Sequence, residues 1–160
     1  MLELVLSMRF YLLDRITECV PGEVARGIKN VTLSEDFMEE HFAGIPVMPG
    51  TLILESLAQL SGYLLAVTQY PDDPHKHKAV LSTVEKAKFR KVVRPGDQLA
   101  LESRLLSIRE DAGKVECTAS VMEDIVVTTR LMFYFADLKN EVLEANRREI
   151  FSIWRTGASA

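Results

Sequence analysis

Hydrophobic and polar positions alternate over several short stretches of the chain. Residues 10–20 and 23–33 form two such stretches, and Pro21-Gly22 lies between them. Proline followed by glycine is typical of a tight turn, so this region predicts a hairpin of two strands. Four more β-rich stretches follow over residues 79–93, 98–110, 114–124 and 125–138. Turn residues separate them, and such short links predict an antiparallel meander.

Residues 49–70 have a different pattern, in which apolar side chains occupy most sides of a helical cylinder. These side chains are Leu52, Ile53, Leu54, Leu57, Leu60, Leu64 and Leu65. A helix that is apolar nearly all round is buried. Two strands, one buried helix and four strands together predict an α+β domain in which a sheet wraps around the helix. We expect this domain over residues 1–138, followed by an amphipathic helical extension over residues 139–160.

Composition narrows the functional classes. The chain has 160 residues, of which 48% are hydrophobic and 26% charged, as in ordinary soluble domains. Its net charge of −4 argues against a nucleic-acid-binding protein. The N-terminus lacks the basic segment of a signal peptide. Glu55 and Gln59 make a membrane span over residues 51–69 costly, so we expect a soluble, cytoplasmic protein.

The cysteine and histidine spacings give no metal or disulfide motif. Cys19 and Cys117 are far apart and are expected to be buried thiols. We expect His75 and His77 to be solvated loop residues rather than metal ligands. Ser61 is not part of a nucleophile elbow, which argues against a serine hydrolase.

The buried helix carries one carboxyl group that needs an explanation. Buried acids are rare, and they are either paired or functional. Gln59 lies four residues after Glu55 on the same helical face, so its amide can hydrogen-bond the carboxyl group. This pairing fits both an inert core network and an oriented acid.

The segment "HFAGIPVMPG" places His41 just before the same helix. Glycine permits close backbone approach, and the amides at a helix start attract negative charge. Histidine accepts protons near neutral pH, whereas a carboxyl group among leucines tends to stay protonated. A base, an acid and an anion-stabilising helix end suit proton abstraction beside a carbonyl, with loss or gain of water at the next carbon.

The segment "HFAGIPVMPGTLILESLAQLSG" closely resembles the signature of the FabZ-like 3-hydroxyacyl-acyl carrier protein dehydratases. The stretches "LLDRI" and "KAKFRKVVRPGDQLALE" extend the similarity over most of residues 9–138. The resemblance implies a hotdog fold, an antiparallel sheet around a long central helix. It also implies a hydro-lyase that converts a 3-hydroxyacyl thioester into the trans-2-enoyl thioester, in fatty-acid or related lipid or polyketide synthesis.

The resemblance also implies a role for each matching residue. His41 would remove the α-proton, and Glu55 would protonate the departing hydroxyl. Gly50 would offer its N–H to the thioester carbonyl, and Gln59 would orient Glu55. A glutamate at the acid position implies dehydration without isomerisation, and no metal or organic cofactor is implied. Related enzymes place the site at a homodimer interface, with the histidine and the acid from different subunits, and the sequence leaves open a trimer of dimers.

Two further groups of residues have both a functional and a structural interpretation. Phe42, Ile45 and Phe89 are candidate walls of an acyl tunnel, although core packing is the ordinary role of such side chains. A basic run is a candidate docking patch for acyl carrier protein and its phosphopantetheine-linked acyl chain, or else a solvated strand face. Its members are Lys86, Lys88, Arg90, Lys91 and Arg94.

The chain departs from the family pattern at positions beside the base. Glu40 stands where glycine is usual, and Ala43 where proline is usual, which indicates a divergent member. The alternatives are a hotdog-fold acyl thioesterase, an enoyl-CoA hydratase and a non-enzymatic acyl-binding subunit. The complete set of His41, Gly50, Glu55 and Gln59 argues against the last of these.

Overall fold

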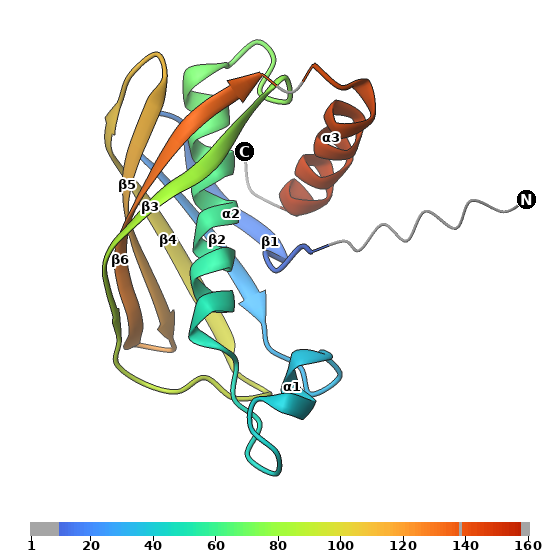
Figure 1. The fold of residues 1–160 in the computed structure, drawn as a ribbon, viewed down its shortest axis with the longest axis vertical. Coiled ribbons are helices and arrows are strands. Elements are labelled where there is room, and N and C mark those ends of the chain that lie inside the picture. The colour runs from blue at the N-terminus through green and yellow to red at the C-terminus, as the bar shows by residue number, and fades with distance from the viewer. Residues whose placement is uncertain (1–9, 138, 158–160) are drawn as a thin grey trace, which may run out of the picture.

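The computed structural model describes residues 10–137 and 139–157. Its elements are β1 (Arg15–Val20), β2 (Val24–Asn30), α1 (Phe37–Glu40), α2 (Gly50–Gln69), β3 (His77–Phe89), β4 (Gln98–Ile108), β5 (Ala112–Val121), β6 (Asp124–Asp137) and α3 (Glu141–Arg155). The strands form one antiparallel sheet in the order β1-β2-β4-β5-β6-β3. Figure 1 shows this sheet curving around α2. The predicted α+β architecture with a central helix is confirmed.

The predicted turns and strands agree with the structure in most places. Gly22 adopts a positive φ of 83° in the turn between β1 and β2, a conformation that glycine reaches without steric cost. Strands β4, β5 and β6 pair in sequence, as the meander predicts. The prediction is wrong for β3, which pairs with β6 instead of β4. Strand β4 pairs with β2 instead, so β1 and β3 form the two edges of the sheet that curves around α2.

Helix α2 supplies the centre of the core. Leu57, Leu60, Leu64 and Leu65 have no exposed surface, and the inner faces of the strands pack around them. Burying each leucine side chain contributes about 1.5–3 kcal/mol to folding. Helix α2 is also long and apolar enough to cross a membrane, but 56% of its most apolar window is buried inside the fold. Its apolar character is therefore explained by the core of a soluble protein.

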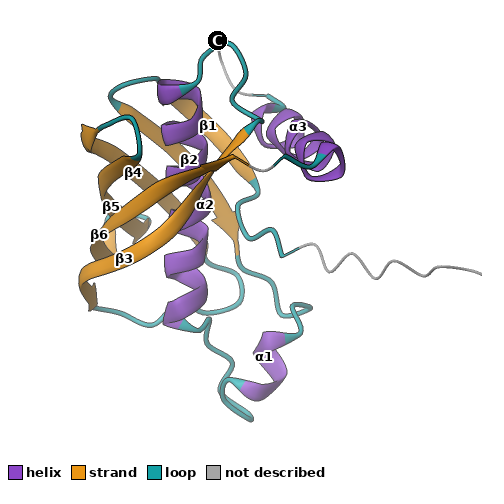
Figure 2. Ribbon diagram, turned by 45° about the horizontal axis from the view of Figure 1, so that its top comes forward, coloured by secondary structure: helices purple, strands orange, loops and turns teal. Residues whose placement is uncertain are grey.

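Helix α3 lies against the end of the molecule near β1 and the C-terminal half of α2 (Figures 1 and 2). Asn140 caps its first turn by accepting hydrogen bonds from the backbone N–H groups of Val142 and Leu143. Its apolar face buries Ile150, Phe151 and Trp154. The Trp154 indole N–H donates to the Leu13 carbonyl at 2.6 Å, so the helix is tied to the segment that precedes β1.

Candidate active site

Glu55 and Gln59 lie on the one side of α2 that the sheet leaves uncovered. Both side chains are partly buried, in contrast to the fully buried leucines on the other sides of the helix. Gln59 Nε2 donates a hydrogen bond to Glu55 Oε1 at 3.0 Å. The structure therefore brings these two predicted site residues together as the spacing of four residues indicated.

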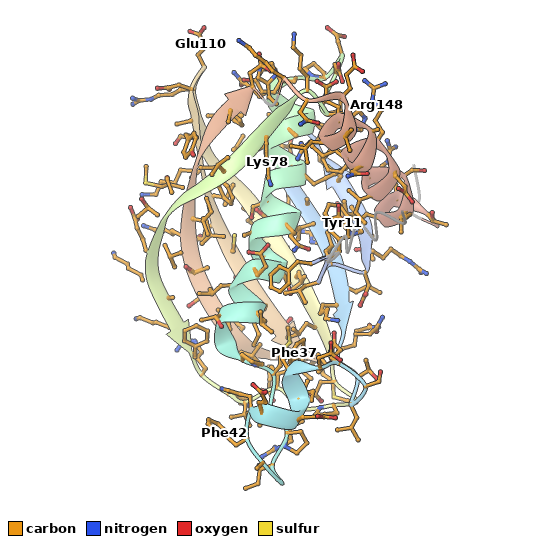
Figure 3. All side chains as sticks on the ribbon, turned by 45° about the vertical axis from the view of Figure 1, so that its right-hand side comes forward. Tyr11, Phe37, Phe42, Lys78, Glu110 and Arg148 are labelled. Carbon is orange, nitrogen blue, oxygen red and sulfur yellow. The ribbon has the colours of Figure 1, made fainter. Side chains whose placement is uncertain are left out.

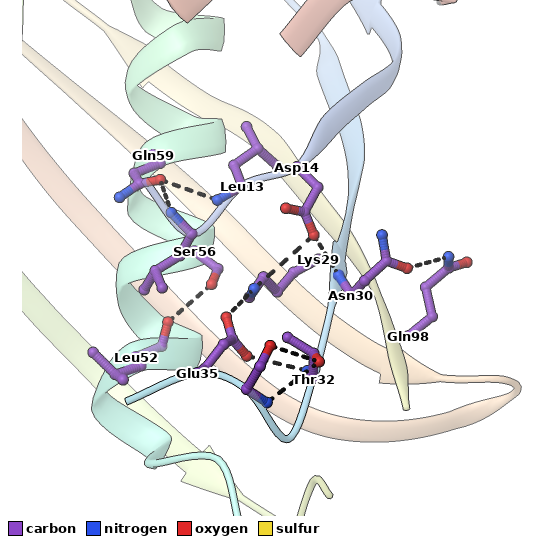
Figure 4. Close-up of polar contacts among 12 residues, drawn as sticks. Leu13, Asp14, Lys29, Asn30, Thr32, Glu35, Leu52, Ser56, Gln59 and Gln98 are labelled. Atoms are coloured by element: carbon purple, nitrogen blue, oxygen red, sulfur yellow. Dashed lines mark hydrogen bonds and ion pairs between the residues drawn. The ribbon is translucent and has the colours of Figure 1, made fainter. Parts of the chain in front are cut away.

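The orientation of the Gln59 amide is fixed by the backbone before β1. Gln59 Oε1 accepts from the N–H groups of Leu12 at 2.9 Å and Leu13 at 3.1 Å (Figure 4). Gln59 Nε2 also donates to the Phe10 carbonyl at 2.8 Å. Because the amide oxygen is occupied, only the amide NH₂ can face Glu55. Glu55 Oε1 is thus an acceptor, so any proton that the Glu55 carboxyl group carries lies on the other oxygen, Oε2.

These contacts also correct the predicted first strand. Residues 10–14 were expected to belong to it, but β1 begins at Arg15. The backbone of Leu12 and Leu13 hydrogen-bonds a side chain of α2 instead of continuing the ladder with β2. The sequence offers no local signal for this, because 46 and 47 residues separate the partners.

His41 directly follows α1 and has a defined tautomer. Its Nδ1 lies 3.0 Å from the Val47 carbonyl oxygen, which can only accept, so Nδ1 carries the proton. In the neutral ring, Nε2 then keeps a free lone pair and can act as a base. The Val47 N–H donates back to the His41 carbonyl at 2.8 Å, and the Phe42 ring stacks on the imidazole at 4.2 Å.

A buried ion pair holds the chain that leads to His41. The Lys29 side chain is 5% exposed, and its ammonium group lies 2.5 Å from Glu35 Oε1 and 4.0 Å from Asp14 Oδ2 (Figure 4). Glu35 Oε2 also accepts from the Thr32 N–H at 3.2 Å. Glu35 and Met38, which is buried, thus fix the turn and the short helix α1 immediately before the histidine.

Gly50 opens α2, where a backbone N–H has no acceptor within the helix. A Cβ on this residue would lie 2.6 Å from Cε1 of Phe89, so the close approach of the ring requires glycine. The preceding loop is tied to the strand side by the Met48 N–H, which donates to the Val93 carbonyl at 2.8 Å. The predicted anion-stabilising amide thus lies beside the end of β3.

A cavity of about 570 Å³ opens beside Glu55. Its walls come from α2, β3, β6, α3 and the segment before β1. Tyr11 and Lys78, two of the lining residues, are labelled in Figure 3. Glu55 and Gln59 line it, but His41 is not among the described residues that do. Within one chain, the predicted base therefore does not line the cavity beside the predicted acid.

The predicted tunnel residues also lie outside that cavity. Phe42 is 60%, Ile45 63% and Phe89 51% exposed, so core packing does not explain them. The five basic residues Lys86, Lys88, Arg90, Lys91 and Arg94 are all exposed, on the end of β3 and the loop after it. Lys91 pairs with Asp124 at 2.6 Å, and Phe89, within this segment, lies against Gly50 at the start of α2.

The surroundings of the two cysteines make their thiols structural rather than reactive. Burial raises the pKa of the Cys117 thiol to about 11, against the opposing effect of hydrogen bonds with Ser61 and Ser103. Burial likewise raises the pKa of the half-buried Cys19 thiol to about 11, so neither thiol is a nucleophile at neutral pH.

The two histidines after α2 were predicted to be solvated loop residues, but both are partly buried and His77 begins β3. The His77 ring stacks on Tyr70 at 4.0 Å, and the His75 ring lies 5.1 Å from that of Phe151. Within residues 10–137 and 139–157, no cluster of three or more His, Cys, Asp or Glu side chains could hold a metal ion.

Sequence reasoning missed the α3 side of the cavity. Leu143, Asn146, Arg147 and Ile150 contribute to it from a helix about ninety residues after Glu55. The amphipathic pattern predicted this helix but gave no indication of where its apolar face would bind. Lys78 and Leu81 of β3 were missed for the same reason, since facing α2 depends on the whole curvature of the sheet.

Comparisons with known proteins agree with these features. A FabA-like domain model matches residues 5–130. The 3-hydroxyacyl-[acyl-carrier-protein] dehydratase FabZ of Levilactobacillus brevis is 42% identical over 130 residues, covering 81% of this chain and 86% of that protein. The FabZ of Nitratidesulfovibrio vulgaris is 50% identical over 113 residues, covering 70% of this chain and 72% of that protein.

Solved structures share the fold. The dehydratase heterocomplex ApeI:P from Xenorhabdus doucetiae matches with a TM-score of 0.66 at 18% identity, over 87% of this chain and 90% of that one. A hypothetical thioesterase with coenzyme A from Streptococcus pneumoniae matches with a TM-score of 0.61 at 11% identity, over 79% and 88%. The sequence matches, which are far closer, decide the family. This chain belongs to the FabA-like family, and within it to the FabZ-like 3-hydroxyacyl-acyl carrier protein dehydratases.

Proposed function

We propose that His41 and Glu55 carry out the dehydration of 3-hydroxyacyl thioesters, the reaction that FabZ-like membership assigns to this enzyme. These roles rest on one observation: hydrogen bonds orient His41 and Glu55 in complementary ways. The Val47 carbonyl leaves His41 Nε2 free to accept a proton. The Gln59 amide leaves the outer oxygen of Glu55 free to donate one. An acid and a base are thus prepared for opposite proton transfers.

The reaction then follows from these assignments. His41 Nε2 removes the proton from Cα, and the electron pair forms the Cα–Cβ double bond as the Cβ–O bond breaks. Glu55 protonates the departing hydroxyl, which leaves as water and gives the trans-2-enoyl thioester. The Gly50 N–H stabilises the negative charge that develops on the thioester oxygen. The imidazolium and carboxylate that remain return to their starting forms by proton exchange with water.

A homodimer completes this site. His41 does not line the cavity beside Glu55 of its own chain, so each of these residues requires its partner from another chain. Strand β3 is an edge of the sheet, thirteen residues long, and it exposes Leu81, Val84 and Phe89. A long apolar edge strand normally pairs with another strand. Pairing of two β3 strands would cover these side chains and bring the start of one α2 towards the Glu55 side of the other.

The substrate is delivered by acyl carrier protein in the cytoplasm. The basic residues at 86–94 adjoin the start of α2 and the loop that carries His41. Their positive charge complements an acidic carrier protein and the phosphate of its phosphopantetheine arm. Phe42, Ile45 and Phe89 lie at the same end of the molecule and form the apolar entrance for the acyl chain once a second subunit covers them.

Hydration of a trans-2-enoyl thioester tests the assignment, because the reverse reaction uses the same groups. Purified enzyme should hydrate octenoyl-acyl carrier protein, and both His41→Ala and Glu55→Gln should lower kcat at least about a hundredfold. Glu39→Gln, an exposed carboxyl two residues before His41, is the matched control and should keep wild-type activity. Normal turnover by His41→Ala would overturn the mechanism. Release of free thiol without hydration would identify a thioesterase instead.

A further inference from the structure

The cavity beside Glu55 extends along α2 to the apolar face of α3. Glu55 and Tyr63 both line the cavity, and eight residues of α2 separate them, so its floor is about 12 Å long. At the Tyr63 end the Phe151 ring packs edge-on at 4.8 Å between ring centroids. Ile150 and Trp154 of the same helix also line the cavity there. The acid thus lies at one end and the apolar face of α3 at the other.

Helix α3 is attached on two sides, so this wall is fixed. The Trp154 indole donates to Leu13, which itself donates to Gln59. The Arg147 side chain is partly buried, and its guanidinium donates to the carbonyls of Pro74 at 3.1 Å, His75 at 3.1 Å and His77 at 3.0 Å. One set of contacts holds α3 to the segment before β1, and the other holds it to the loop before β3.

The wall is chemically suited to an acyl chain. Leu81 and Phe133 on the sheet side and Leu143, Ile150 and Phe151 on the α3 side give the cavity an apolar surface along most of its length. Leu143 is 46% exposed at the rim, so its side chain is free to change size without disturbing the core. Helix α3 begins at Glu141 and thus lies outside the region that the FabA-like domain model matches, residues 5–130.

We propose that α3 is a chain-length gauge: its side chains end the acyl-binding cavity and set the longest acyl chain that reaches Glu55 productively. This inference rests on the proposed function, because it takes the cavity beside Glu55 as the acyl site. A chain that extends past Tyr63 must displace Ile150 or the Leu143 side chain. The enzyme therefore prefers short and medium chains over long ones, through a segment that belongs to this chain's own C-terminal region.

The experiment compares kcat/KM for hydration of crotonyl, octenoyl and hexadecenoyl thioesters of acyl carrier protein. Wild-type enzyme should act on octenoyl better than on hexadecenoyl thioester. Leu143→Ala should raise the hexadecenoyl-to-octenoyl ratio about tenfold, and Leu143→Trp should lower octenoyl relative to crotonyl turnover by a similar factor. Ile153→Ala is the matched control, since Ile153 is 48% exposed and is not among the lining residues. It should leave both ratios unchanged.

The outcomes separate the two proposals. If wild-type enzyme hydrates none of the three thioesters, the proposed function fails. If it hydrates them but both Leu143 variants keep the wild-type ratios, only the gauge is overturned. A wild-type enzyme that processes hexadecenoyl as well as octenoyl thioester would also overturn the gauge. Because Leu143 lies at the rim, folding of both variants is expected, and thermal unfolding checks it.

Discussion

The amide of Gln59 donates to Glu55 Oε1 at 3.0 Å while its own oxygen accepts two backbone N–H groups. The direction of this hydrogen bond decides what the carboxyl group can do. Because Glu55 Oε1 accepts from Gln59, the other carboxyl oxygen is the one available for the proposed proton transfer. A glutamate inside an apolar helix thereby has a fixed orientation, as the proton-donor role that we propose for it requires.

Replacing Gln59 by leucine should remove this orientation. Loss of positioning is expected to reduce kcat about tenfold to a hundredfold with a smaller change in KM. The free energy of unfolding should also fall by about 1–3 kcal/mol, because the Leu12 and Leu13 N–H groups lose their acceptor. Steady-state kinetics and urea unfolding measure both effects. Gln98→Leu is a matched control on the far side of β2, where the Gln98 amide donates a hydrogen bond to Asn30. Unchanged kcat for Gln59→Leu would refute the positioning role.

Gly50→Ala should create a steric conflict with Phe89, because the new Cβ would lie 2.6 Å from the ring. The expected cost is about 1–3 kcal/mol of unfolding free energy, as for other overpacked sites. In the double variant with Phe89→Ala, most of this cost should disappear. A double-mutant cycle of urea unfolding measures the coupling between the two positions. Additive effects, with no recovery in the double variant, would show that the ring is not the cause.

Glu35→Ala should lower the free energy of unfolding by more than the partial exposure of Glu35 suggests. It would leave the Lys29 ammonium, 5% exposed, with only the Asp14 carboxylate at 4.0 Å. Breaking one side of a buried ion pair costs about 3–5 kcal/mol, whereas replacing both partners by apolar groups costs much less. Unfolding free energies of Glu35→Ala and of the Lys29→Met, Glu35→Leu double variant make the comparison. An equally unstable double variant would contradict this explanation.

Stability should fall in mild acid because of His75. Burial first, and then the charge of Arg148, lowers the pKa of His75 below 6.5, while Asp73 opposes the shift. As the pH falls, the unfolded chain therefore protonates at His75 before the folded chain does. The stabilisation that neutral His75 gives the fold is complete above pH 6.5 and is lost as the pH falls towards the folded-state pKa. His75→Gln should show a shallower loss of stability over the first pH unit below 6.5. The same slope in wild type and variant would assign the acid sensitivity to other groups.

The sequence predicted those features that depend on local chemistry. Pro21-Gly22 marked the hairpin, the apolar residues after Gly50 marked α2, and the four-residue spacing placed Gln59 beside Glu55. Features that depend on distant packing were not predictable. The pairing of β3 with β6 and the docking of α3 through Trp154 join segments about 40 to about 140 residues apart, for which no local pattern exists. The stacking of His77 on Tyr70 was missed for a different reason, because the histidine was assigned to a solvated loop although it begins β3.

The central claim is that His41 of one subunit and Glu55 of another form each dehydratase site. Mixing His41→Ala subunits with Glu55→Gln subunits, under conditions that exchange subunits, tests it most directly. Random pairing makes half of the dimers mixed, and each mixed dimer has one intact site, so about one quarter of wild-type hydration activity should return. Affinity tags on the two variants verify that mixed dimers form. Mixed dimers without regained activity would contradict the shared site.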